Sequence, residues 1–135
     1  MYSITDLIPQ RAPIVMVDEL LGVENNASRS SLVIRDENIF VRHGELTSSG
    51  VIEHIAQSAA ARVGFVYKER GEAVPLGFIG SVNNFVLNRN PKVGERLVTS
   101  ISIIQEVFSI TLIEAHVMVD EECVASCRMK IFLDV

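Results

Sequence analysis

The stretch VIEHIAQSAAARVGFV, from Val51 to Val66, has apolar or small residues around nearly its whole circumference. Its middle, IAQSAAA, contains no charge, whereas a helix on a protein surface would show a polar face there. Ser48 or Ser49 can cap such a helix, with Glu53 near its first turn. We therefore predict one mostly buried helix, whose small residues let other elements approach closely.

The sequence on either side of this helix predicts β-strands. Two runs precede the helix and are joined by an Asn25-Asn26 turn, and four runs follow it, the last three alternating apolar with polar residues. The predicted strands are Ile14–Val23, Ala27–Ile34, Leu76–Leu87, Leu97–Val107, Ser109–Val119 and Cys123–Val135, and Asp36–Gly44 is predicted as a loop. A helix buried on all sides needs a sheet curved around it. The expected fold is α+β, an antiparallel six-stranded sheet wrapped around one long central helix (the hot-dog fold), as a single domain over residues 1–135.

Composition excludes several partners. The net charge is −5 and the Lys and Arg residues are scattered, so no basic face for nucleic acid is expected. No apolar run approaches the roughly 20 residues of a membrane span, and MYSITDLIPQ at the start lacks the pattern of a signal peptide. Cys123 and Cys127 would lie about 13 Å apart on a strand, too far for a disulfide. Two reduced thiols fit a cytoplasmic protein.

Three segments, in order and correctly spaced, resemble the hot-dog (3R)-3-hydroxyacyl-[acyl-carrier-protein] dehydratases. LIPQRAPIVMVDELLGVE is similar to the opening L-P-H-R-x-P segment of that family, with its apolar residues and aspartate. SGVIEHIAQSAAA is similar to the central-helix segment, and GFIGSVNNFVLNRNPKVGERL to the strand and turn that follow it. The resemblance runs from about Leu7 to Leu133. Within the family, the chain looks most similar to a branch that has an I-E-(aromatic)-x-A-Q motif and is often tied to pigment or aryl-polyene synthesis.

The resemblance implies a particular chemistry. In that family a histidine abstracts the α-proton of a 3-hydroxyacyl thioester, and a carboxylic acid from the helix of the other subunit protonates the departing hydroxyl. Backbone N–H groups at the helix start polarise the thioester carbonyl. The implied substrate is an acyl thioester of acyl-carrier protein (ACP) or coenzyme A (CoA), in fatty-acid or polyketide-type synthesis, and neither a cofactor nor a metal is needed.

Carried onto this chain, the resemblance assigns the helix carboxylate to Glu53. Gln57 follows one turn later and can orient that carboxyl group by hydrogen bonding. The alternative is a solvent-exposed glutamate that only compensates the helix dipole. The family's histidine position is occupied by Gln10, whose amide cannot titrate. Because general-base catalysis contributes about 10²–10⁴-fold, we predict a dehydratase-type lyase that is impaired as a homodimer.

The candidate substrate-binding residues are Gly50, Val51, Gly80 and His54. Gly50 resembles the glycine at the helix start, although its gap to the glutamate is two residues shorter than in the family. Gly80 either leaves room for an acyl chain or the partner's backbone, or serves sheet packing. His54 either contacts substrate or is a packed, hydrogen-bonded histidine. Of the other histidines, we interpret His43 as an exposed loop residue and His116 as structural or on the surface.

Three functions remain open from the sequence. The first is the weakened dehydratase, with a homodimer expected because the sheet leaves edge strands. The second is an acyl thioesterase that uses Glu53 alone. The third is a non-catalytic subunit that forms a heterodimer with a histidine-bearing dehydratase paralogue.

Overall fold

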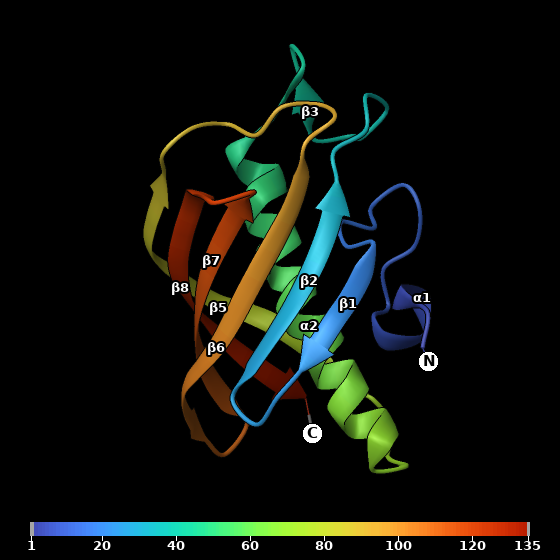
Figure 1. Ribbon diagram of the computed structural model, residues 1–135. Helices are drawn as coiled ribbons and strands as arrows, with labels where there is room; N and C mark the ends of the chain where they lie inside the picture. Colours follow the sequence, from blue (N-terminus) through green and yellow to red (C-terminus); the bar gives the residue numbers. More distant parts are fainter. Residues whose placement is uncertain (1, 135) are drawn as a thin grey trace.

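The computed structural model describes residues 2–134. Its six-stranded antiparallel sheet has the order β1-β2-β6-β7-β8-β5 and curves around helix α2 (Figure 1). The sheet strands are β1 Glu19–Val23, β2 Ala27–Val33, β5 Leu76–Leu87, β6 Arg96–Val107, β7 Ile110–Val119 and β8 Glu122–Asp134. The helices are α1 Ile4–Leu7 and α2 Ser48–Glu69. The predicted sheet wrapped around one long helix is confirmed.

The first strand begins later than predicted. β1 starts at Glu19, so the apolar run from Ile14 to Val17 is not part of the sheet. The reason is a side chain from the helix. The backbone N–H of Met16 donates to Gln57 Oε1 over 2.6 Å, and Gln57 Nε2 donates to the carbonyl of Ile14 over 2.8 Å. This segment therefore satisfies its backbone on the helix and cannot also pair as a strand.

The segment before α2 also differs from its prediction as a loop. It contains a small hairpin, β3 Val41–Arg42 and β4 Glu45–Leu46, with His43 and Gly44 in left-handed conformation at its turn. The helix then begins one or two residues earlier than a cap at Ser48 or Ser49 predicts. Its cap is Thr47, whose Oγ1 accepts from the Gly50 N–H over 3.3 Å. Glu53 consequently lies in the second turn rather than the first.

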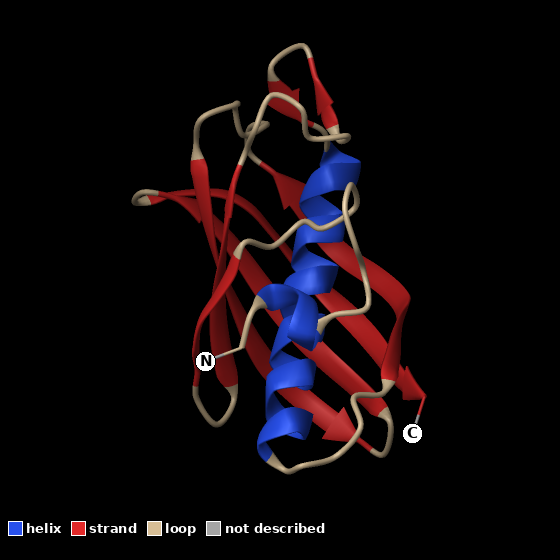
Figure 2. Cartoon of the chain, turned by 90° about the vertical axis from the view of Figure 1, so that its right-hand side faces the viewer, coloured by secondary structure: helices blue, strands red, loops and turns tan. Residues whose placement is uncertain are grey.

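Helix α2 is covered on two sides. Its sheet-facing residues, including Val51, Ile55 and Ala59, join the main core between helix and sheet. On the other side Ala61 packs against Leu7 and Ile8, because the N-terminal segment lies over the helix (Figure 2). The contact at Gly64 is so close that a β-carbon there would meet the carbonyl group of Leu7. The predicted buried helix with small contact residues is confirmed.

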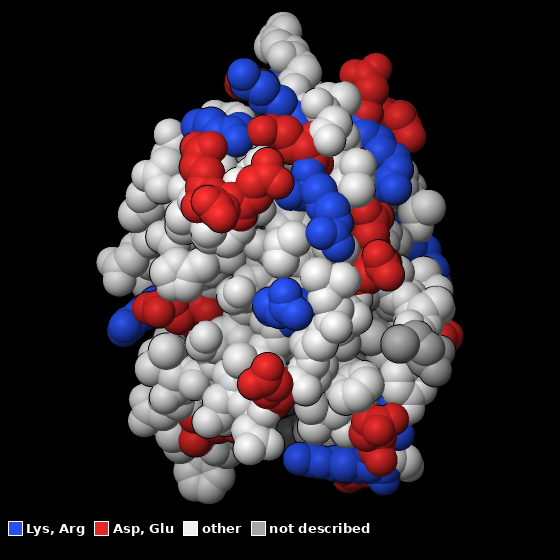
Figure 3. All heavy atoms as spheres, viewed as in Figure 1, with Lys and Arg blue, Asp and Glu red and all other residues white. Residues whose placement is uncertain are grey.

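The outer face of the sheet and its edge at β5 carry different kinds of side chain. Acidic and basic side chains are mixed over the face turned away from the helix (Figure 3). The edge strand β5 instead exposes apolar side chains, with Leu76 53% and Phe78 55% exposed. An unpaired, apolar edge of this length is a site for pairing with another chain. Within residues 2–134, no helix is long and apolar enough to cross a membrane.

Candidate active site

A pocket of about 290 Å³ lies between α2, the N-terminal segment and the edge strand β5. Its walls are mainly apolar, as is usual for small-molecule sites. The lining residues are Leu7, Pro9, Gln10, Glu53, Ala56, Gln57, Ala60, Val63, Val74, Pro75, Gly77, Phe78, Ile79, Ile131 and Leu133. Of these, Glu53 alone has a titratable side chain. The pocket can therefore hold an apolar chain beside one carboxyl group.

The orientation of Glu53 is fixed from the following turn of the helix. Gln57 Nε2 donates to Glu53 Oε2 over 2.7 Å, which leaves Oε1 of that carboxyl group for another partner. Gln57 itself is 1% exposed. Its Oε1 is occupied by the Met16 N–H, so both ends of its amide have defined roles. The helix thus presents one carboxylate oxygen, held in a known direction, to the pocket.

Gln10 reaches the same pocket as Glu53 of its own chain. Its Oε1 is buried and has no hydrogen-bond partner within residues 2–134. The resemblance implied that the two polar groups of one site come from different subunits; within this single chain, Gln10 and Glu53 line one pocket. Gln57 of α2 hydrogen-bonds to the backbone of Ile14 and Met16, and this holds the segment after Gln10 against the helix of the same chain. The assignment of position 10 to the family's base remains a prediction.

Gly50 and Val51 do not line this pocket. The Gly50 N–H donates to Thr47, and the Val51 N–H donates to the Thr47 carbonyl over 3.0 Å, so neither is free for a thioester. A β-carbon on Gly50 would lie 2.6 Å from the β-carbon of Phe40. The glycine therefore serves the packing of the helix start under the preceding segment.

Gly80 is also absent from the pocket, although its neighbours Phe78 and Ile79 line it. It lies at an irregularity in the pairing of β5 with β8, between Ile79 and Ser81. The ring of Phe132 on β8 occupies the space where its side chain would be. Of the two sequence interpretations, the structure shows packing of an aromatic ring over a glycine and no room there for an acyl chain.

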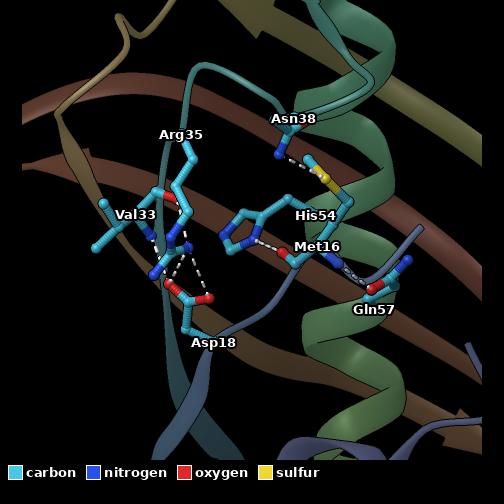
Figure 4. A network of polar contacts seen from close by, with 7 residues as sticks. All are labelled: Met16, Asp18, Val33, Arg35, Asn38, His54 and Gln57. Carbon is cyan, nitrogen blue, oxygen red and sulfur yellow. Dashed lines mark hydrogen bonds and ion pairs between the residues drawn. The ribbon is translucent and has the colours of Figure 1, made fainter. Parts of the chain in front are cut away.

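His54 is the fourth candidate, and it does not line the pocket either. It is fully buried, and its Nδ1 lies 2.7 Å from the Met16 carbonyl oxygen (Figure 4). Its Nε2 lies 2.6 Å from Thr99 Oγ1. A carbonyl can only accept, so Nδ1 carries the proton and Nε2 accepts from the hydroxyl. Desolvation lowers the pKa of His54 to about 4, while the bond to Met16 and the charge of Asp18 oppose that shift. Neutral His54 therefore links α2 by hydrogen bonds to the N-terminal segment at Met16 and to the sheet at Thr99.

The burial of His54 predicts a loss of stability in mild acid. The unfolded chain binds a proton near pH 6.5, whereas the folded chain does so only near pH 4, so stability falls as pH drops through this window. We expect His54 alone to remove about 2 kcal/mol of unfolding free energy between pH 7.5 and 5. Denaturant unfolding at both pH values measures it. The matched variant His116→Gln, at an exposed histidine, should keep this difference, and His54→Gln should abolish it. Equal pH dependence in both variants would contradict the assignment.

The other histidines lie outside the pocket. His43 is exposed on the β3–β4 turn, and exposed His116 is 3.4 Å from Glu114 on the outer face of the sheet. Cys123 and Cys127 are both free thiols, as predicted. Sequence reasoning missed the β5 side of the pocket, Gly77 to Ile79. The apolar run LGFIG could have indicated it, because an edge strand with this sequence would expose apolar side chains that can line a pocket.

The curved sheet wrapped around the central helix defines a protein of the hot-dog fold. The family model of ApeP-like proteins, described as ApeP dehydratase, matches residues 2–134. The chain belongs to this family.

The chain is also similar to individual proteins. A 3-hydroxyacyl-[acyl-carrier-protein] dehydratase FabZ of Desulfotalea psychrophila is 27% identical, over 94% of this chain and 88% of the relative. The solved dehydratase heterocomplex ApeI:P from Xenorhabdus doucetiae superposes with a TM-score of 0.92 at 20% identity, covering 100% of this chain and 93% of the other. The Streptococcus mutans protein smu.793, solved with acetyl-CoA, has a TM-score of 0.68 at 9% identity, covering 85% and 86%. These solved structures share the fold.

Proposed function

We propose that this chain is the acid-donating subunit of a two-subunit 3-hydroxyacyl-thioester dehydratase. A single observation carries the proposal: among the residues that line the pocket, Glu53 is the only one able to give or take a proton. Dehydration needs a base for the α-proton as well as an acid for the hydroxyl. Gln10 and Gln57, the other polar side chains of the pocket, supply neither.

The base therefore comes from a second subunit in this proposal. The partner's histidine takes the proton from C2 of the substrate, the released electron pair forms the C2=C3 bond, and the C3–O bond breaks. Glu53 delivers its proton from Oε1 to the departing hydroxyl, which leaves as water. Gln57, by donating to Oε2, keeps the reacting oxygen directed into the pocket. Transfer of the base's proton back to Glu53 through solvent completes the cycle.

The exposed edge strand supports the same proposal. Gly77, Phe78 and Ile79 of β5 line the pocket and at the same time belong to the unpaired edge of the sheet. A subunit that pairs with β5 would thus lie against the mouth of the site. The structurally similar ApeI:P protein is a dehydratase heterocomplex, which is the kind of assembly that this arrangement requires.

A complementation experiment tests the proposal. The partner is a histidine-bearing dehydratase paralogue from the same organism, with its own helix carboxylate replaced by glutamine so that it is inactive alone. Mixed with this chain, it should form a heterodimer by light scattering and convert a 3-hydroxyacyl-ACP to the enoyl product. This chain alone should give no enoyl product. Enoyl formation by this chain alone, or none from the heterodimer, would contradict the proposal.

Gln10→His is the companion variant, since it places an imidazole beside Glu53 within one chain. Under the proposal the pocket lacks only a base, so the variant alone should gain enoyl formation if residue 10 is the base position of the family, and the heterodimer should keep its rate. No gain by the variant alone would show that a histidine at position 10 does not serve as the base.

A lone carboxyl group in an apolar pocket also suits a second function, hydrolysis of acyl thioesters. In that reaction Glu53 would activate a water molecule toward the thioester carbonyl. The two functions give different products from the same assay. Release of free thiol from a saturated acyl thioester by this chain alone would support the hydrolase, and enoyl product from the heterodimer supports the dehydratase.

A further inference from the structure

A second cavity, of about 480 Å³, lies along the C-terminal half of α2. Val63, Ile131 and Leu133 line both this cavity and the active-site pocket, so these three side chains separate the two spaces. The chemistry proposed above uses no residue that lines only the second cavity.

The cavity is amphipathic. Its floor is formed by isoleucines of the sheet, of which Ile101 and Ile113 are 1% and 2% exposed. Its mouth is polar, with Glu24, Arg62 and Glu106 among the lining side chains. The polar and charged lining residues are Glu24, Asn25, Arg62, Tyr67, Arg70, Glu106 and Thr111. A cavity with an apolar floor and such a polar rim can hold a small amphipathic molecule.

Arg62 is the unusual residue of this cavity. Its guanidinium is half-buried and Nη2 donates to the Asn25 carbonyl over 2.7 Å, but Nε is buried without any partner within residues 2–134. No carboxylate of the described chain lies within ion-pair distance of it, whereas Arg70 at the same mouth has Glu72 at 3.9 Å. Burial lowers the pKa of Arg62, and the charge of Glu106 opposes this only in part. A desolvated, unpaired donor of this kind is costly unless something binds to it.

We propose that this cavity binds an amphipathic carboxylate, with its apolar chain on the isoleucine floor and its carboxylate on Arg62. A guanidinium has only donors, so its complement is an acceptor, and an anionic acceptor gives the stronger bond. The carboxylates of Glu24 and Glu106 also line the cavity and disfavour a polyanion by repulsion. The ligand has two sources with the same chemistry: a free fatty acid, or the distal carboxylate of an acyl thioester that extends past Val63 from the active site.

Binding is tested without any catalytic assay, so the result does not depend on the proposed function. Sodium decanoate, below its micellar concentration, is titrated into the ¹⁵N-labelled chain, and the Nε–H resonance of Arg62 is followed by NMR. Decanoate should shift this resonance in a saturable manner, and 1-decanol should bind at least 10-fold more weakly because it lacks the charge. No saturable shift, or equal affinity for both probes, would overturn the proposal.

Calorimetry on variants provides the second measurement. Arg62→Gln should weaken decanoate binding by about 10- to 100-fold, while Arg29→Gln, at an exposed arginine of β2, should leave it unchanged. Arg62→Lys keeps the charge and should retain part of the affinity, which separates loss of the ion pair from loss of folding. Decanoate bound equally well by the folded Arg62→Gln variant would also overturn the proposal. The 9-carboxynonanoyl and decanoyl thioesters of N-acetylcysteamine, compared in the same way, distinguish a distal substrate group from a free acid.

Discussion

Replacing Glu53 with glutamine should reduce enoyl formation by the complemented heterodimer by about 10²–10⁴-fold, the usual contribution of a general acid or base. Glutamine has nearly the same shape and can still accept the hydrogen bond from Gln57, so the pocket should keep its structure. It has no proton to deliver to the departing hydroxyl. The rate is measured from the appearance of the enoyl thioester at saturating partner subunit.

The control for this variant is Glu121→Gln, at an exposed glutamate of the turn before β8. It should keep the wild-type rate, and both variants should form the heterodimer with unchanged stoichiometry. A Glu53→Gln heterodimer with more than a tenth of the wild-type rate would show that the proton comes from another group.

Replacing Gln57 with leucine should lower the free energy of unfolding by about 3–5 kcal/mol, because buried polar groups that lose their partners cost about 1–3 kcal/mol each. The substitution leaves the N–H of Met16 and the carbonyl of Ile14 without partners, and releases Glu53. Leucine is no smaller than glutamine, so a cavity is not the cause. Denaturant unfolding monitored by circular dichroism measures the loss.

Gln105→Leu, at an exposed glutamine of β6, is the matched control and should change stability by less than about 0.5 kcal/mol. Hydrogen exchange localises the effect, since the Met16 amide should lose its protection in Gln57→Leu while the sheet amides keep theirs. A loss below 1 kcal/mol, or a protected Met16 amide, would show that the segment does not depend on this glutamine.

The elements that the sequence predicted correctly are those with a local periodic signal. The uncharged circumference of α2 and the alternation of β6 to β8 are each visible within one segment. The first strand was predicted too long, because part of the predicted range is hydrogen-bonded to a helix side chain instead of to a strand. Met16 donates to Gln57, which is 41 residues away in the sequence. A pattern of apolar residues cannot reveal that a distant amide will satisfy their backbone.

In the candidate site too, the contacts within one helix were predictable and the contacts with distant residues were not. Glu53 and Gln57 share one helix face by their spacing alone, and the structure places them in contact. His54, the neighbour of Glu53, differs from it only by rotation about the helix, but that rotation directs it to Thr99 on β6. The sequence could not assign a role to Gly50 or Gly80. A glycine indicates that another group comes close, but not which group; here it is Phe40 at Gly50 and Phe132 at Gly80.

The open edge of β5 has a consequence for how a cell produces this chain. If the chain works with a second subunit as proposed, each copy made in excess of that subunit carries an unpaired strand with exposed apolar side chains, which is a template for aggregation. Synthesis of the two subunits in equal amounts, from adjacent reading frames, would keep that strand covered from the moment of folding. Gene order and expression ratio would then be under selection because they keep the apolar edge strand from being exposed.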